Sequence, residues 1–204
     1  WGIHWHRSDL GGMVDNPDRG DSYVPTTSAA VYLPRRGHHI YNGSTWVNEG
    51  IQLESEARTN LLLNSGTLST QNATVAAAPN TLSFTGTGTV TLTGTSTAGP
   101  LVGTGTGENN RVVLTFTPTA GTLTLTVSGT VTNAQLELGS TPSSYIPTAG
   151  ATVTRSAETL TVAAANLPYS AVNMSIQMDG EMTYADEGVT KQHQFLRWYV
   201  GLGG

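Results

Sequence analysis

The chain has 204 residues and a formal net charge of −5, and 11% of its residues are charged, against roughly a quarter in an average soluble domain. A negative, charge-poor chain lacks the basic stripe that a nucleic-acid-binding surface needs. Because cysteine is absent, disulfides and thiolate metal sites are excluded. No apolar run approaches the roughly 18 residues that span a bilayer, so we expect no membrane insertion.

The first zone, residues 1–49, is rich in aromatic residues, histidine and proline, which argues against a long helix. We predict an irregular or β-ribbon segment with a hairpin turn at the Asn-Gly pair of YNGSTW. His4 and His6 project to one side of an extended strand and are candidate ligands for a divalent metal. Alternatively, the neighbouring tryptophans pack at an interface, and the zone serves attachment or oligomerisation.

A charged stretch, ESEARTN, then precedes three leucines at residues 61–63. Glu54 and Glu56 share one face of a strand, and carboxylates about 5–10 Å apart can catalyse glycoside hydrolysis. Arg58 lies on the same face and neutralises them, so we interpret the cluster as architecture. The leucines predict a core strand that is buried on both faces.

Residues 66–148 form the next zone, and between residues 81 and 132 nearly every second residue is threonine, in alternation with apolar residues. This period-two pattern predicts half-buried strands with threonine on the exposed side. Pro118 and the Ala-Gly pair at 120–121 are predicted to turn one strand into the next. The GTGTG run at 103–107 lacks the lysine and the strand–helix context of a phosphate-binding loop, and is predicted to be turn material. We therefore predict an all-β, antiparallel sandwich. Its inward-facing positions include Val112, Leu114, Phe116, Leu123, Leu125 and Val127.

The last zone holds a short strand and a linker at residues 149–165, followed by a second period-two pattern, AVNMSIQMDGEMTYAD and QFLRWYV. We predict that residues 163–204 begin a second β-sandwich that the sequence truncates. The chain begins at Trp1 and ends in WYVGLGG, so we expect it to be a window on a longer polypeptide.

Exposed aromatic rings are the candidate binding residues, because sugar rings stack on tryptophan and tyrosine faces. The candidates are Trp46, Tyr41, Tyr145 and Tyr32. The motifs of serine hydrolases, zinc peptidases and P-loop proteins are absent, as is any nucleophile–base pair. We therefore predict a protein that is not an enzyme.

A structural Ca²⁺ is the one cofactor that the oxygen-bearing side chains suggest. Their spacing matches no defined calcium loop, so no cofactor is predicted. The possible ligands are Glu49, Glu54, Glu108 and Asn109.

Two segments resemble signatures of phage and prophage virion proteins. Residues 50–65, GIQLESEARTNLLLNS, resemble the entry signature G-L-x-x-E-x-A-R-T-N-L-L, and residues 133–155, NAQLELGSTPSSYIPTAGATVTR, resemble the exit signature of the same domain. The resemblance implies a jelly-roll domain at residues 50–162, similar to galactose-binding and carbohydrate-binding-module folds. It further implies that a concanavalin-A-like sandwich follows.

The signature residues look like scaffold and not like a sugar site. They are Glu56, Arg58, Asn60, Gln135 and Glu137. Because Arg58 and Glu137 belong to the two opposite ends of the domain, we expect them to pair across the junction.

The family resemblance implies a virion appendage, such as a tail fibre or head spike, on the particle exterior. Its expected partners are other virion proteins, further copies of itself (a trimer is favoured) and host surface polysaccharide. The main alternative is a carbohydrate-binding module of a secreted bacterial glycosidase or adhesin. A third is a depolymerase tailspike, for which the sequence offers no carboxylate pair in a groove.

Overall fold

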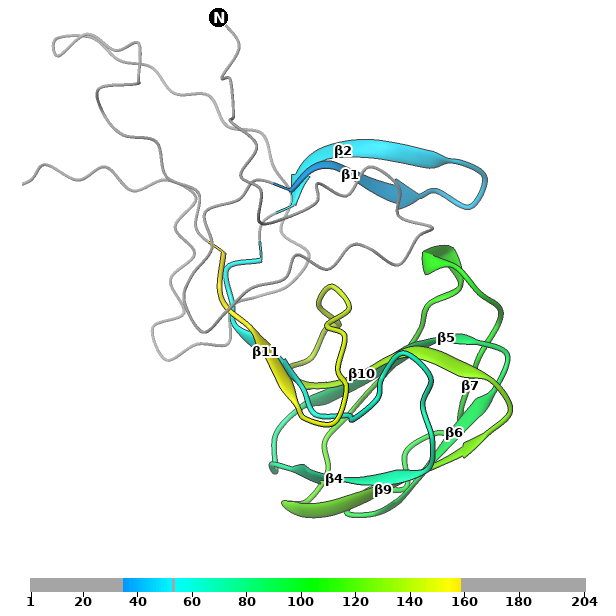
Figure 1. The fold of residues 1–204 in the computed structure, drawn as a ribbon, viewed down its shortest axis with the longest axis vertical. Coiled ribbons are helices and arrows are strands. Elements are labelled where there is room, and N and C mark those ends of the chain that lie inside the picture. The colour runs from blue at the N-terminus through cyan, green and yellow to red at the C-terminus, as the bar shows by residue number, and fades with distance from the viewer. Residues whose placement is uncertain (1–34, 53, 159–204) are drawn as a thin grey trace, which may run out of the picture. The chain divides into compact units, whose positions relative to one another are not determined.

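A computed structural model of the chain describes residues 35–52 and 54–158 (Figure 1). The chain divides into two units, Trp1–Val162 and Ala163–Gly204, and all described residues belong to the first. The described part is all-β, as predicted, with one 3-10 turn at Glu108–Asn110. No helix in this part could cross a membrane. The predictions for His4, His6 and the second sandwich lie outside the described residues.

The predicted Asn-Gly hairpin is confirmed. Strands β1 (Arg35–Tyr41) and β2 (Trp46–Gln52) pair antiparallel. In the loop between them, the Asn42 side chain accepts hydrogen bonds from the backbone N–H groups of Ser44 and Thr45 at 3.0 and 2.9 Å. Gly43 has φ 93°, a conformation that glycine adopts without steric cost.

The remaining strands form antiparallel sheets that share one hydrophobic core, and we call residues 54–158 the two-sheet domain. One sheet has the order β10-β5-β8, a second has the order β4-β9-β6-β7, and β11 pairs with β3 (Figure 1). The strand bounds are β3 (Arg58–Asn60), β4 (Gln71–Val75), β5 (Asn80–Gly86), β6 (Thr89–Gly94), β7 (Leu101–Val102), β8 (Val112–Phe116), β9 (Gly121–Ser128), β10 (Val131–Leu138) and β11 (Val153–Arg155).

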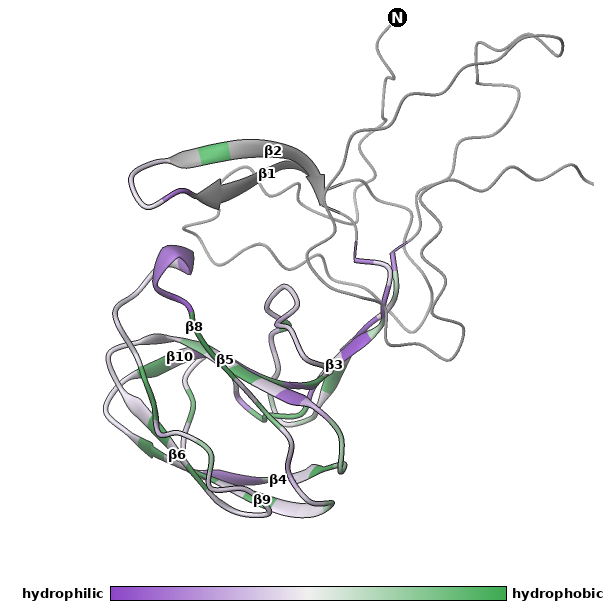
Figure 2. Ribbon diagram, turned by 180° about the vertical axis from the view of Figure 1, so that it is seen from behind, coloured by the Kyte–Doolittle hydropathy of each residue, from purple (hydrophilic) through white to green (hydrophobic). Residues whose placement is uncertain are grey.

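The core follows from the period-two pattern, because alternate side chains of a strand point to opposite faces. In β9 the leucines are buried while Thr122 and Thr126 are exposed. Hydrophobic positions recur on strands of both sheets (Figure 2), and both sheets contribute to the same cluster. Its members include Leu82, Phe84, Leu136, Val90, Leu92, Leu123 and Leu125.

The prediction of a core strand at residues 61–63 is wrong. β3 ends at Asn60, and of the three leucines Leu62 is buried while Leu63 is exposed. The Asn60 side chain accepts a hydrogen bond from the Leu62 N–H at 3.1 Å. The chain therefore turns immediately after the strand, and one leucine enters the core.

A β-bulge in β10 re-aims its C-terminal half. The pairing with β5 shifts between Thr132 and Gln135, and Asn133 has φ 49°. Bulges of this kind change which face a side chain occupies. As a result Leu136 lies in the core beside Leu82, while Gln135 and Glu137 lie on the opposite face of the sheet.

The glycine-rich runs at residues 86–88 and 103–105 pair with each other. Gly86 and Gly105 exchange backbone hydrogen bonds of 2.6 and 3.0 Å, and the Gly103 N–H donates to the Gly88 carbonyl at 2.8 Å. A Cβ atom at Gly103 would overlap the Gly86 carbonyl oxygen. The GTGTG run is thus a loop, as predicted, whose glycines permit close backbone contact.

Candidate functional site

The two ends of the two-sheet domain meet at one place, which we call the junction. β3 and β11 pair antiparallel, so that Arg58, Thr59 and Asn60 lie opposite Arg155, Thr154 and Val153. The hydroxyl oxygens of Thr59 and Thr154 are 2.8 Å apart. The two segments that resemble entry and exit signatures therefore form one structural unit.

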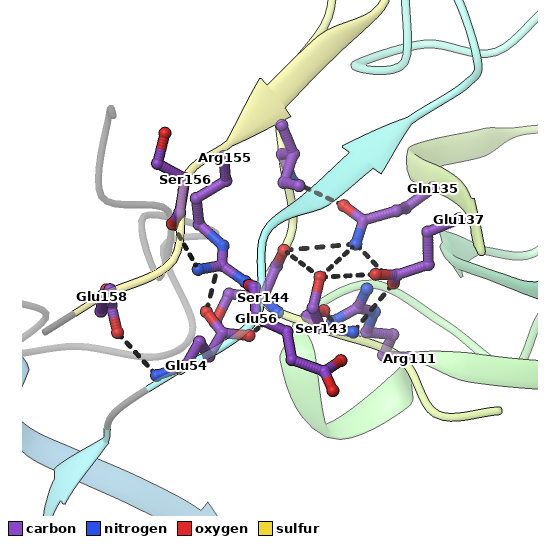
Figure 3. A network of polar contacts seen from close by, with 11 residues as sticks. Glu54, Glu56, Arg111, Gln135, Glu137, Ser143, Ser144, Arg155, Ser156 and Glu158 are labelled. Carbon is purple, nitrogen blue, oxygen red and sulfur yellow. Dashed lines mark hydrogen bonds and ion pairs between the residues drawn. The ribbon is translucent and has the colours of Figure 1, made fainter. Parts of the chain in front are cut away.

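A buried charged cluster lies beside these strands (Figure 3). Arg155 is completely buried, and its Nε lies 3.3 Å from the Glu54 carboxylate. The Glu54 N–H donates to the Glu158 carboxylate at 2.7 Å, and the Glu158 N–H donates to the Glu54 carbonyl at 2.8 Å. The other Glu54 carboxylate oxygen accepts from the Ser144 N–H at 2.7 Å. Glu54, at the start of the domain, is thus bonded to Arg155, Glu158 and Ser144, which lie near its end.

A second polar group holds the loop after β10 against the outer face of the three-stranded sheet (Figure 3). The buried Glu137 carboxylate accepts hydrogen bonds from Gln135 Nε2 and from the Ser143 N–H and Oγ, at 2.6–2.8 Å. Arg111 donates to Ser83 Oγ at 2.7 Å and to the Ser143 carbonyl at 2.9 Å. Buried polar groups are stable when their hydrogen bonds are made in this way, so the network orders the loop.

Asn60 joins the end of β3 to β10 and to the loop between β10 and β11, residues 139–152, which we call the exit loop. Its Nδ2 donates to the carbonyls of Ala134 and Ile146 at 2.9 and 2.8 Å. Its Oδ1 accepts from the N–H groups of Leu62 and Leu136 at 3.1 and 3.2 Å. Both donors and both acceptor positions of the amide are therefore used.

The expected pair between Arg58 and Glu137 is not formed. Arg58 makes an ion pair of 2.6 Å with Glu56 and donates to the Leu138 carbonyl, whereas Glu137 accepts from Gln135 and Ser143. Arg58 also lies directly over Gly139, where a Cβ atom would overlap its guanidinium. The expected neutralisation by Arg58 holds for Glu56, whereas Glu54 faces a different arginine, Arg155.

Tyr145 is not the exposed sugar-stacking ring that we expected. Its side chain is 4% exposed, and its hydroxyl hydrogen-bonds Ser65 Oγ at 2.8 Å. Burial raises the pKa of the phenol, against the smaller opposing effects of the Ser65 hydrogen bond and the positive charge of Arg111. The exit loop that carries Tyr145 packs onto the domain, which removes the ring from solvent.

The other candidates give a mixed result. Tyr41 and Trp46 lie directly opposite each other at the end of the β1–β2 hairpin, and Tyr32 lies outside the described residues. Within residues 54–158 the aromatic residues are Phe84, Phe116 and Tyr145, and all three are buried. No group of three or more His, Asp or Glu side chains in the described part could hold a metal ion.

The four-stranded sheet presents one regular polar surface, which we call the threonine face. Its side chains alternate with core residues of β4, β9 and β6, and cross-strand register places them in rows, such as Asn72–Thr124–Thr93. None is charged, and Thr124 donates to Asn72 at 2.8 Å. The members are Asn72, Thr74, Thr91, Thr93, Thr122, Thr124 and Thr126.

Sequence reasoning did not identify Arg111, Ser143, Arg155 or Glu158 as members of the junction. One signal was available: residues 66–154 contain three charged residues, and two of them, Arg111 and Glu137, belong to this network. Charged side chains are almost never fully buried unless they are paired, so the few charged residues of such a domain are candidates for buried pairs. Arg155 is the last residue of the exit motif, and its partner, Glu54, can be identified only from the tertiary structure.

No family model matches this sequence, and neither a curated protein nor a solved structure shows significant similarity to it.

Proposed function

We propose that the chain is a structural component of a phage virion, located on an exterior appendage of the head or tail, and that its β-domains engage host glycans. The observation that carries the proposal is the junction. Glu54, Arg58 and Asn60 come from the segment that resembles the family's entry signature, and Gln135 and Arg155 come from the exit segment. Both segments contribute to one buried network, which gives a physical reason for the two motifs to occur together.

We propose further that the two-sheet domain is a jelly roll. Successive strands from β4 to β6, and again from β8 to β10, alternate between the two sheets, as the Greek-key connections of a jelly roll require. A concanavalin-A-like sandwich that begins with residues 163–204 remains part of this proposal, because those residues show a second period-two pattern.

Within the described domain, the threonine face is the surface that we assign to glycan contact. All three aromatic rings of residues 54–158 are buried, so a sugar ring cannot stack on them. Contact with a glycan would instead use hydrogen bonds from the threonine hydroxyl groups and the Asn72 amide. Threonine is restricted at χ1 and loses little side-chain entropy when a ligand orders it. Because the face carries no charge, its expected ligand is a neutral polysaccharide. Tyr41 and Trp46 at the hairpin end are the second contact point.

Immunogold labelling of purified particles, with an antibody against this chain, tests the virion role. We expect label on the exterior of the head or tail. Particles without label, together with recovery of the chain on a secreted glycosidase or adhesin, would contradict the proposal and favour a carbohydrate-binding module. Shortening of host capsule by the purified chain would instead identify a depolymerase.

A further inference from the structure

The strands that join the two ends of the domain are too short to fix their own register. β3 and β11 contain three residues each. In a β-ladder, a slip of one residue moves every side chain to the opposite face. Three paired residues offer little resistance to such a slip, so another interaction has to select the observed pairing of Arg58 with Arg155.

The buried charges beside the strands can supply this selection. Arg155 is fully buried, and it contacts the Glu54 carboxylate while donating to the carbonyls of Glu56 and Ser156 at 3.2 Å. A slip of β11 by one residue would turn Arg155 away from these acceptors. Removing one partner of a buried ion pair is strongly destabilising, whereas an intact pair adds little net stability. In some proteins such a pair specifies one arrangement of the chain, and that is the role we infer here.

The same cluster also holds the chain where it enters and leaves the domain. Glu54 and Glu158 exchange two hydrogen bonds, one between backbone groups and one from the Glu54 N–H to the Glu158 carboxylate. The chain therefore enters and leaves the two-sheet domain at neighbouring positions. Residues 61–152 form the rest of the domain between the paired strands β3 and β11.

We propose that Glu54, Arg155 and Glu158 form a register clamp, which fixes the pairing of β3 with β11 and holds the first and last residues of the two-sheet domain together. This inference does not depend on a role in a virion. The core of the domain is formed by other residues, mainly from β5, β6, β9 and β10. The clamp can consequently open while the core stays folded.

Hydrogen exchange of the full chain tests the clamp through the substitution Arg155→Met, which keeps an unbranched side chain as far as the position of Nε but removes the charged guanidinium. We expect amides of residues 58–60 and 153–158 to exchange at least 10-fold faster, while those of β6 and β9 keep their rates. Arg58→Met is the matched control, because Arg58 lies opposite Arg155 but pairs with the more exposed Glu56. We expect less than a threefold change in the control. Unchanged exchange at the junction in Arg155→Met would overturn the proposal.

A disulfide provides the second test, and it also covers the case in which Arg155→Met fails to fold. Thr59 and Thr154 are directly opposite, at a separation that suits a disulfide, and the chain has no cysteine of its own. Thr59→Cys with Thr154→Cys fixes the register covalently. In the Arg155→Met background, we expect the oxidised form to regain the slow junction exchange of the wild type. Continued fast exchange or unfolding in the oxidised form would show that Arg155 supports the core and does not act as a clamp.

Discussion

Asn60 shows how one side chain can hold two distant segments of the chain together. Its amide bonds β10, the exit loop and the turn that leads to Leu62, and it is completely buried. Asparagine presents two donors and two acceptor positions at fixed angles, and no other side chain of similar volume does so.

We expect Asn60→Leu to lower the free energy of unfolding by about 3 kcal/mol or more, because several buried backbone groups lose their partner at about 1–3 kcal/mol each. Urea unfolding monitored by circular dichroism measures the change. The control is Thr154→Ala at the exposed end of the same junction, where a loss within about 0.5 kcal/mol is usual for a surface site. Equal losses in the two variants would contradict the assigned role of Asn60.

Tyr145 makes stability depend on alkaline pH. Because burial raises its pKa in the folded state, the unfolded phenol ionises first, from about pH 10 upwards. The folded state still holds the proton there, so its stabilising contribution is complete below about pH 10 and is lost as the pH rises through the folded pKa.

We expect Tyr145→Phe to lose about 1 kcal/mol at pH 8, through the missing hydrogen bond to Ser65, but to lose less than the wild type between pH 8 and pH 11. Urea unfolding of both proteins at the two pH values measures the difference. Identical losses over this pH range would show that Tyr145 does not titrate differently in the folded and unfolded states.

At the scale of strands, two irregularities decide what each face presents. The bulge at Asn133 places Gln135 and Glu137 on the outer face, and the turn after Asn60 leaves one of three leucines in the core. By contrast, β4, β6 and β9 alternate without interruption. Their uninterrupted register is what makes the threonine face a continuous surface.

The threonine face gives a prediction at this scale. We expect the triple substitution Thr91→Val, Thr93→Val and Thr126→Val to weaken retention on immobilised neutral host polysaccharide at least 10-fold, because it removes hydroxyl groups and keeps the side-chain shape. Affinity electrophoresis measures the retention, and thermal unfolding checks that the fold is intact. Thr117→Val, at an exposed threonine outside the rows, is the control. Full retention by the triple variant would exclude this face as the contact surface.

At the scale of the whole molecule, the two ends of the two-sheet domain pair with each other through β3 and β11. Few charges lie inside it. Arg155 and Arg111 are engaged by residues distant in the sequence, Glu54 and Ser83, whereas Glu137 accepts from the nearby Gln135 and Ser143. The threonine face therefore carries no charge, and the buried charged groups that select the pairing of the two chain ends are concentrated at the junction.

Closing the junction covalently should therefore stabilise the whole domain. A disulfide between Thr59→Cys and Thr154→Cys in the otherwise native chain would close a loop that contains every strand from β4 to β10. The loop-entropy model gives an upper value of about 4.7 kcal/mol for a loop of about 100 residues, which is close to the size of this one. Comparing urea unfolding of the oxidised and reduced forms measures the gain. A disulfide that fails to form would contradict the register of β3 and β11.

Much of the fold could be predicted from the sequence, whereas little of the junction could. The strands of the two-sheet domain and the β1–β2 hairpin follow from alternation and from an Asn-Gly pair, which act over a few neighbouring residues. The burial of Tyr145 was missed because it depends on the exit loop folding back onto Ser65. The pairing of Arg58 with Glu56 follows from their positions on one strand face, whereas the expected second partner, Glu137, is engaged by Gln135 and Ser143.

Local patterns in the sequence were enough to predict that the described part is all-β, where its exposed threonines lie and that it carries few charges, because side-chain alternation is a local property of an extended backbone. The tertiary structure decided which ends meet, which face Glu137 occupies and where Arg155 finds its carboxylate. These outcomes depend on strand register and on a bulge, and both are selected by contacts between residues that lie far apart in the chain.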